Sequence, residues 1–288
     1  MKYKLYNLII LVVSIFIISP VFSQNELLKR EIISRVIDSI DAHNQLEFEM
    51  FRSERNKNNE FIEGKFYAKL INNPYKIYIK NEKPRKGAEV LYIDGENDGK
   101  ALVNPNTFPY INLSISPENS ILLAGGHHYI TEAGFNRMSQ TFKFYIEKYE
   151  DLFLKMIHYE GIFKWDNKKC HKLRIEYNDY KIVSYYAKGG ETVNQICNKK
   201  LINIAKIKEL NPGIDIKKSL YENQKIIITN HYSKTSILYI NLENYFPIYQ
   251  MTYDENGLYE KYIYSKLILN KKIKMKNLIK NTKTMIFN

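Results

Sequence analysis

Two adjacent histidines come nearest, among the residues of this sequence, to a metal-binding pattern. His127 and His128 follow a pair of glycines, and Glu132 lies four residues after His128. Imidazole nitrogens and carboxylates ligate zinc, and a spacing of four places two ligands on one face of a helix. The helix is expected to begin only near Thr131, so that geometry is not assured, and the sequence offers no third ligand. We interpret the histidines as a structural pair beside a glycine turn, with Thr131 and Glu132 capping the helix, and predict no metal site.

Nucleophilic catalysis also lacks a recognisable pattern. The sequence contains no G-x-S-x-G motif, the commonest signal of a serine hydrolase. Cys170 and His171 are adjacent in a predicted strand, where neighbouring side chains point to opposite faces, which opposes a catalytic dyad. Cys170 and Cys197 are the only cysteines, and one pair in a long chain is no disulfide framework, so two buried free thiols are favoured. We predict no catalytic residue, no cofactor and a non-enzymatic protein.

The first 23 residues have the layout of a secretory signal peptide. Lys2 and Lys4 precede the apolar run 8–18, and the predicted cleavage site lies between Ser23 and Gln24. The run is shorter than the roughly 20 residues that span a bilayer, and no cysteine follows it to carry a lipid. The sequence thus predicts an exported protein with no stable membrane insertion after signal cleavage.

The composition is basic and rich in tyrosine. Removal of the leader's two lysines lowers the formal net charge from +12 to +10, and the sequence contains 24 tyrosines. Nucleic-acid binding needs such a surface, but export argues against it. Positive charge on an exported protein favours anionic envelope polymers or membrane surfaces, or is a solvated face without a partner. Both interpretations stay open.

Hydrophobic periodicity divides the chain into two helices and a long series of strands. Residues 26–42 and 131–153 each have one apolar face at helical spacing, whereas apolar and polar residues alternate from Leu46 onward. Strands are predicted over 46–53, 60–71, 75–82, 89–105 (a hairpin), 161–165, 169–179, 236–243 and 247–269. Because the apolar face of the sheet must be covered, the helices are the available cover. The prediction is an α+β domain in which a curved antiparallel sheet wraps over helices.

The series of strands is interrupted between residues 183 and 232. The predicted elements there are a strand (182–188), two helices (191–200 and 202–210) and a strand (225–229). Gly189 and Gly190 permit a tight turn before the first helix, and Asn211-Pro212-Gly213 ends the second. The order of strand, helix, helix and strand is compact enough to close into one small sheet.

This interruption resembles a LysM domain. The segments that carry the likeness are "YYAKGGETVNQIC", "INIAKIKELNPGI" and "LYENQKIII". The positions that match the LysM pattern are Tyr186, Gly190, Glu191, Thr192, Ile196, Ile207, Leu210, Asn211, Pro212, Leu220 and Gln224. The sequence departs from it at Val193, Cys197 and Asn223, where LysM domains have leucine, alanine and glycine. The last departure is mild, because asparagine tolerates the left-handed conformation.

LysM domains bind polymers of N-acetylglucosamine, above all bacterial peptidoglycan, in a shallow groove between two loops. Transferred by position, the resemblance implies that the glycan contacts Gly190, Glu191, Thr192, Asn211, Pro212, Gly213 and Ile214. Backbone amides freed by glycines would bond the acetamido groups, and Ile214 would pack on a sugar face. The alternative is that Thr192 and Asn211 mainly cap helices, and the two roles are compatible.

The rest of the chain resembles the outer-membrane lipoprotein carrier (LolA-like) superfamily. The likeness lies in "NEFIEGKFYAKLINNPYKIYIKNEKPRKGAEVLYIDGENDGKALVNP" and in "SILYINLENYFPIYQMTYDENGLYEKYIYSKLIL". More closely, "KGAEVLYIDGEN" with "HHYITEAGFNRM" is similar to an uncharacterised branch of exported bacterial proteins, known chiefly as a domain of unknown function. The resemblance implies a half-open β-barrel with helices as a lid, around an apolar cavity that holds acyl chains in the superfamily.

Together these expectations give an α+β, LolA-like half-barrel with an inserted βααβ LysM module. The expected boundaries are a signal peptide (1–23), the first part of the half-barrel (24–182), the LysM domain (183–232) and the last strands with a basic tail (233–288). The expected partners are peptidoglycan and a lipid or lipoprotein acyl chain, without nucleic acid, in the periplasm or cell envelope of a Gram-negative bacterium. The alternatives are an assembly platform with a filled barrel and a cell-wall-remodelling hydrolase.

Overall fold

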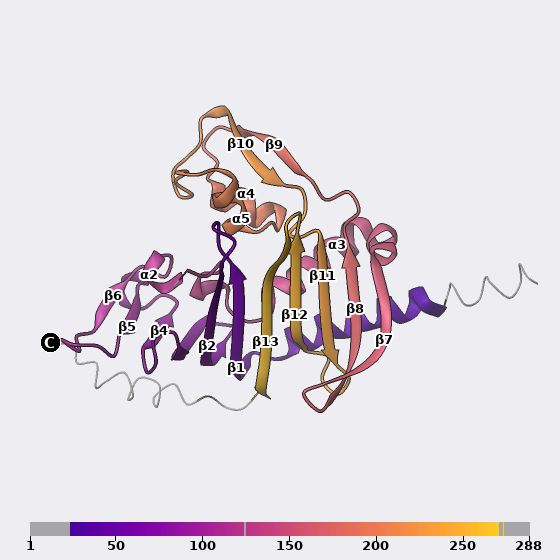
Figure 1. Ribbon diagram of the computed structural model, residues 1–288, viewed down its shortest axis with the longest axis horizontal. Coiled ribbons are helices and arrows are strands. Elements are labelled where there is room, and N and C mark those ends of the chain that lie inside the picture. The colour runs from indigo at the N-terminus through magenta and orange to yellow at the C-terminus, as the bar shows by residue number, and fades with distance from the viewer. Residues whose placement is uncertain (1–23, 124, 271–272, 274–288) are drawn as a thin grey trace, which may run out of the picture.

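The computed structural model describes residues 24–123, 125–270 and 273. The predicted signal peptide and most of the predicted basic tail lie outside these residues. Figure 1 shows one large curved sheet with helices behind it and a smaller unit over one end of the strands.

The large sheet contains eleven strands within the described residues, and each strand is antiparallel to its neighbours. The strands are β1 (Gln45–Arg55), β2 (Phe61–Ile71), β3 (Lys76–Lys83), β4 (Glu89–Ile93), β5 (Ala101–Asn104), β6 (Leu113–Ile115), β7 (Ile157–Trp165), β8 (Lys168–Glu176), β11 (Thr235–Asn241), β12 (Pro247–Asp254) and β13 (Gly257–Leu269). Their order is β6-β5-β4-β3-β2-β1-β13-β12-β11-β8-β7. Because β1 pairs with β13, the first and last strands of the described residues are neighbours in the middle of the sheet.

Alternation along β1 decides which side chains face the core. Leu46 and Phe48 are buried, and the next residues on the same face are Met50, Arg52 and Glu54, which line a cavity together with Phe48. The core face of the sheet therefore begins apolar at one end of this strand and becomes polar at the other.

Two helices cover the core face of the sheet: the helix over residues 24–42 and α3 (Asn136–Met156). Their apolar stripes join the sheet in one buried cluster, to which they contribute Ile32, Ile33, Val36, Ile40, Phe142, Phe153 and Leu154. Shorter turns are η1 (Asn97–Gly99), α2 (Ser120–Leu123) and η2 (Ile130–Glu132). We call the large sheet with these helices and turns the half-barrel.

The second helix begins later than predicted. α3 starts at Asn136, and the residues Ile130–Glu132 form a separate 3-10 turn. Gly134 lies between them with φ of +99°, and a residue in the left-handed region does not continue a right-handed helix. His128 therefore precedes both turns, and it shares no helical face with Glu132.

The interruption folds into a second, smaller sheet with helices, which we call the inserted module. β9 (Ile182–Lys188) pairs antiparallel with β10 (Glu222–Thr229), and α4 (Val193–Lys200) and α5 (Ile204–Leu210) lie between them in the chain. Its buried core contains Ala187, Val193, Ile196, Cys197, Ile202, Ile204, Ile207, Leu220, Ile226 and Ile228, together with Tyr129 of the half-barrel. The module follows β8 and precedes β11, which are neighbours in the large sheet.

The predicted fold class is confirmed: an open antiparallel sheet is covered by helices and carries an inserted unit of two strands and two helices. Cys170 and Cys197 are both buried and unpaired, as predicted.

Candidate functional site

A cavity of about 460 Å³ lies between the core face of the sheet and the segments that cover it. Its apolar lining includes Phe48, Met50, Phe66, Ile79, Val90, Val103, Leu113, Leu122, Phe135, Met138, Phe142, Leu238 and Tyr264. Pockets of roughly 300–1,000 Å³ with mainly apolar walls and a few placed polar groups are typical of small-molecule sites. The size and the walls of this cavity fit that description.

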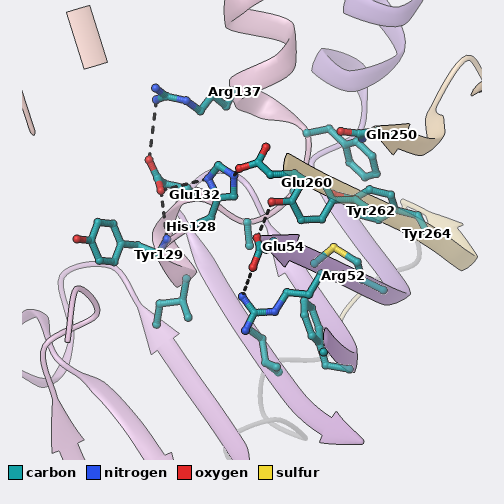
Figure 2. Close-up of a pocket in the computed structure, with 18 of the residues that line it drawn as sticks. Arg52, Glu54, His128, Tyr129, Glu132, Arg137, Gln250, Glu260, Tyr262 and Tyr264 are labelled. Atoms are coloured by element: carbon teal, nitrogen blue, oxygen red, sulfur yellow. Dashed lines mark hydrogen bonds and ion pairs between the residues drawn. The ribbon is translucent and has the colours of Figure 1, made fainter. Parts of the chain in front are cut away.

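One end of the cavity is polar, because the core faces of β1 and β13 end in charged side chains (Figure 2). Arg52 and Glu54 follow on β1, and Glu260 lies on β13. The strand register places Glu54 directly opposite Glu260, and like charges at such positions are destabilising. Donors from other parts of the chain must therefore compensate the two carboxylates.

Glu54 is held by three donors. Its carboxylate accepts hydrogen bonds from Arg52 Nη1 (2.8 Å), Tyr262 OH (2.5 Å) and the backbone N–H of His127 (3.3 Å). The Arg52 guanidinium passes over Gly126, where a Cβ atom would lie 1.5 Å from Nη1. Glycine at position 126 is therefore what allows Arg52 to reach Glu54.

Glu260 is fully buried and lies at the centre of this polar end. Its Oε1 accepts hydrogen bonds from His127 Nδ1 (2.8 Å) and Asn203 Nδ2 (2.6 Å). Its Oε2 accepts from Tyr232 OH (2.9 Å) and Thr252 Oγ1 (3.0 Å). Burial disfavours the ionised carboxylate, but the hydrogen bonds from the neighbouring histidines outweigh burial and hold the pKa of Glu260 well below its usual range. This carboxylate is ionised at neutral pH.

Both histidines face acceptors with both ring nitrogens. His127 Nδ1 meets Glu260, and its Nε2 lies 3.0 Å from the carbonyl oxygen of Arg55. His128 Nδ1 lies 3.6 Å from Glu132 Oε2, and its Nε2 lies 3.4 Å from Glu260 Oε1. Burial disfavours the imidazolium, but these carboxylates outweigh it, raising the pKa of His127 and raising that of His128 to about 10. His128 is therefore a cation at neutral pH.

Glu132 closes the polar end on the side of α3. Its carboxylate accepts a hydrogen bond from the N–H of Tyr129 (3.1 Å) and lies 3.9 Å from Arg137 Nη1. Burial alone would raise the pKa of Glu132, but His128 and Arg137 lower it. Glu132 thus caps a helical turn as predicted, although this turn is η2 and not the long helix.

The same residues satisfy one geometric requirement of a metal site. Ligand atoms of Glu54, His127 and Glu260 lie within 4.8 Å of one another. No third ligand for the histidines is recognisable in the sequence, because both glutamates come from strands remote from them along the chain. These side chains, however, already bond one another or other protein groups, and Nε2 of His127 is committed to the carbonyl of Arg55. The arrangement is a closed hydrogen-bond network, and we assign it no metal chemistry.

We call this group the polar cluster; its members are Arg52, Glu54, His127, His128, Glu132 and Glu260. It continues into the inserted module through Asn203, the buried N-cap of α5, whose side chain bonds Glu260. Lys206 of α5 is also buried and donates to Asp254 Oδ2 at 2.8 Å. Tyr129 of the half-barrel packs in the module's core. The module is therefore docked on the half-barrel by both polar and apolar contacts.

The predicted glycan-binding residues lie on two loops of the inserted module. Gly190, Glu191 and Thr192 connect β9 to α4. The carboxylate of Glu191 accepts hydrogen bonds from Tyr185 OH and from the N–H of Lys188, both at 2.9 Å. Thr192 is the N-cap of α4 and accepts a hydrogen bond from the N–H of Gln195. Both side chains are therefore used within the module.

The second loop contains Asn211, Pro212, Gly213 and Ile214. The Asn211 side chain donates to the carbonyls of Ile207 and Ile227 and accepts from the N–H of Ile227. Ile214 packs against the module's core, whereas Pro212 and Gly213 are exposed. Thr192 and Asn211 thus have the structural roles that the sequence analysis gave as an alternative. The surfaces that remain for a ligand are the glycine backbone and Pro212.

The first loop is hydrogen-bonded to Leu220, which lies later in the chain than the residues 211–214 predicted to bind the glycan. The N–H of Gly190 donates to the carbonyl of Leu220 (3.0 Å), and the N–H of Leu220 donates to the carbonyl of Glu191 (2.8 Å). Tyr221, the next residue, is 73% exposed. The predicted glycan-binding residues did not include Tyr221. It directly follows Leu220, whose backbone is hydrogen-bonded to the first loop.

Part of the signal for the polar cluster is present in the sequence, although it was not predicted. Alternation puts Arg52 and Glu54 on the same strand face as Leu46 and Phe48. Charged residues on an otherwise apolar face indicate a buried polar site. Nothing local in the sequence, however, indicates that the donors come from a loop before α3 and from the inserted module.

The fold and the cavity define a class of protein: an open-sheet domain around an internal cavity, with a LysM domain inserted between two of its strands. The match to the LysM domain covers residues 185–229. Residues 43–193 match the family described as "Protein of unknown function (DUF1571)", and the chain belongs to this family. The LysM resemblance is thus confirmed. No curated protein matches the chain.

The chain is also similar to several solved structures. Lipoprotein LppX from Mycobacterium tuberculosis is 10% identical, with 85% of this chain and 97% of LppX covered and a TM-score of 0.40. The LolA superfamily protein NE2245 from Nitrosomonas europaea is 10% identical, with 85% and 95% covered and a TM-score of 0.32. The MucA/MucB complex from Pseudomonas aeruginosa gives 9% identity, 87% and 60% coverage and a TM-score of 0.41. The fold class itself rests on the strand order of the open sheet and on the helices that cover it.

Within the described part of the chain, no helix is both long enough and apolar enough to cross a bilayer.

Proposed function

We propose that this protein binds peptidoglycan through its LysM domain and holds an acyl chain in the cavity of the half-barrel. It acts as a non-enzymatic binding protein of the cell envelope, exported by the signal peptide predicted over residues 1–23. The observation that carries the proposal is the combination of an apolar-walled cavity of about 460 Å³ with an inserted LysM domain in one chain.

The glycan part rests on the LysM match and on the two adjoining loops. LysM domains bind N-acetylglucosamine polymers, and this module offers an exposed Pro212 and exposed glycines at the expected place. The groove residues remain Gly190, Glu191, Thr192 and Asn211 to Ile214, and we add Tyr221. Glu191, Thr192 and Asn211 shape the loops through internal bonds, so the glycan meets mainly backbone and ring surfaces.

The lipid part rests on the shape and chemistry of the cavity. Its aliphatic and aromatic walls favour an apolar chain, because burying apolar surface is the main source of affinity in such a site. Arg52, His128 and Arg137 line its polar end, but their donors bond protein acceptors, so the apolar walls carry this part of the proposal.

The alternative of a filled barrel that acts only as an assembly platform predicts side chains in the space where the cavity lies. The alternative of a hydrolase needs a nucleophile with a base. Within the described residues, the carboxylates that line the cavity, Glu54, Glu132 and Glu260, are instead bonded within the polar cluster. Both observations favour binding over the alternatives.

Glycan binding is tested by pelleting residues 24–288 with insoluble peptidoglycan at low and moderate salt. We expect salt-resistant binding that falls about tenfold in Pro212→Glu, because a carboxylate would stand in the groove. Lys225→Gln on β10 lowers the net charge by the same amount and is expected to bind as the unchanged protein does. Equal binding by all three proteins, lost with salt, would reduce the LysM domain to a spacer.

The cavity is tested with a fluorescent fatty acid. Ser236 lines the cavity, and Thr235 precedes it on β11 and points to the opposite face. We expect Ser236→Phe to fill the cavity and abolish probe binding, whereas Thr235→Phe leaves it intact. Probe binding that survives Ser236→Phe would place the lipid elsewhere.

A further inference from the structure

The opening of the cavity is marked by the exposed members of its lining. Most lining residues are buried or half-buried, and the exposed ones are Lys83, Pro84, Arg85 and Ile121. Lys83 is the last residue of β3, Pro84 and Arg85 lie in the turn between β3 and β4, and Ile121 lies on α2. The cavity therefore opens between this turn and α2.

An exposed apolar tip lies beside this opening. The loop between β5 and β6 includes Phe108, Tyr110 and Ile111, whose side chains are 86%, 67% and 54% exposed. The rings of Phe108 and Tyr110 meet edge to face at 6.5 Å. The backbone of Tyr110 has φ of +56°, a left-handed conformation that is strained for a bulky residue. Strained backbone of this kind is found most often at functional sites. Pro105 and Leu113, at the two ends of the loop, line the cavity, so the tip borders the opening.

The tip is attached to a basic turn. Asn106 Nδ2 donates to the carbonyl of Lys86 at 3.1 Å, which fixes the β5–β6 loop against the β3–β4 turn. Residues 83–88 and 105–117 contain Lys83, Arg85 and Lys86 and no acidic residue. Lys83 pairs with Glu63, whereas Arg85 and Lys86 are exposed. The opening thus combines large apolar side chains with positive charge.

We propose that this mouth surface, formed by residues 83–88, 105–112 and α2, docks on an anionic lipid membrane. Aromatic and aliphatic side chains insert at the interface between head groups and acyl chains, and lysine and arginine beside them attract anionic head groups. Docking in this orientation presents the opening of the cavity to the bilayer, so that an acyl chain exchanges between them without crossing water. Only this last consequence rests on the proposed function, since docking itself does not depend on what the cavity holds.

The test is flotation of residues 24–288 with phosphatidylcholine vesicles that contain or lack phosphatidylglycerol. We expect binding to the anionic vesicles, weakened by salt. Arg85→Gln with Lys86→Gln removes two charges, each worth about 1 kcal/mol near such a surface, and is expected to weaken binding about 30-fold. Phe108→Ser with Tyr110→Ser is expected to weaken binding to a similar extent at every salt concentration.

Matched controls keep the result specific. Lys57→Gln with Lys225→Gln removes the same charge elsewhere, and Leu152→Ser removes an exposed apolar side chain of α3. Both are expected to leave vesicle binding within about twofold. Binding that responds equally to test and control variants, or no binding to anionic vesicles, overturns the proposal and leaves the tip as a contact for a protein partner. The fluorescent fatty acid assay without vesicles reports on the cavity alone, so failure of docking and failure of lipid binding are separable.

Discussion

At the scale of single residues, the structure is organised by the compensation of two opposed buried carboxylates. Glu54 and Glu260 are register partners, and such a pair is tolerated only because hydrogen-bond donors surround both of them. Arg52 reaches Glu54 only because residue 126 is glycine, and both histidines lie within ion-pair distance of Glu260. Neither feature is a catalytic pattern, but each sets the polarity of one end of the cavity.

Gly126→Ala tests the contact with Arg52. Gly126 is not among the positive-φ glycines, so alanine meets a steric clash and no backbone strain. We expect a loss of about 1–3 kcal/mol in the free energy of unfolding, measured by denaturant titration, because overpacking displaces the guanidinium from Glu54. In an Arg52→Ala background the same substitution is expected to cost less, because the one close contact left for the added Cβ atom is Glu54 Oε2 at 2.7 Å. An equal loss in both backgrounds would contradict the assignment.

His128 predicts a loss of stability towards alkaline pH. Its pKa is raised in the folded state to about 10, above the ordinary value of 6.5, so folding favours the protonated ring. The stabilisation is complete below pH 6.5 and is lost as the pH rises towards 10, by at most about 1.4 kcal/mol per pH unit for one proton. Unfolding titrations between pH 6 and 10 should therefore show a flatter dependence for His128→Gln. The control His158→Gln on β7 should keep the steeper slope, and an unchanged slope in His128→Gln would be inconsistent with this assignment.

At the scale of elements, most of the fold was predictable because alternation and helical spacing are local signals. The strands of the sheet, the helix over 24–42 and the order of elements in the inserted module follow from such patterns. The start of α3 was not predicted correctly, because Gly134 breaks the helix. The residues around Thr131 have the pattern of a cap whether they begin a long helix or a separate short turn. The polar cluster was not predicted either. His127 and Glu260 are remote in sequence and come together only in the folded chain, where β13 pairs with β1.

The junction between the inserted module and the half-barrel rests on Asn203. Its side chain caps α5 by accepting from Ala205 and Lys206 N–H groups, and its Nδ2 also donates to Glu260. We expect Asn203→Ala to lower the free energy of unfolding by about 2–4 kcal/mol, the sum of a lost cap and a lost donor to a buried carboxylate.

Thr192→Ala is the matched control for this junction, since Thr192 caps α4 without contacting Glu260. It is expected to cost only about 1 kcal/mol. If the two substitutions had the same effect in denaturant titrations, Asn203 would be a cap and nothing more.

At the scale of the whole molecule, the LysM domain is docked on the half-barrel close to the polar end of the cavity, as Figure 1 shows for α4 and α5 over the strand ends. A protein anchored to the wall by such a module would hold its cavity in a fixed orientation to the wall. The LysM motif could be predicted from sequence because its residues are contiguous. The docking could not, because Tyr129, Asn203 and Lys206 have partners remote in sequence.

The most direct test of this account is whether the protein carries an acyl chain to the wall. Residues 24–288 are mixed with a fluorescent fatty acid and insoluble peptidoglycan, and the probe in the pellet is measured with and without protein. The account predicts that the probe pellets with the protein, that Ser236→Phe removes the probe but not the protein, and that Pro212→Glu lowers both in the pellet together. Protein that pellets without probe, or probe that binds protein which stays in solution, would contradict the claim that both sites act in one molecule.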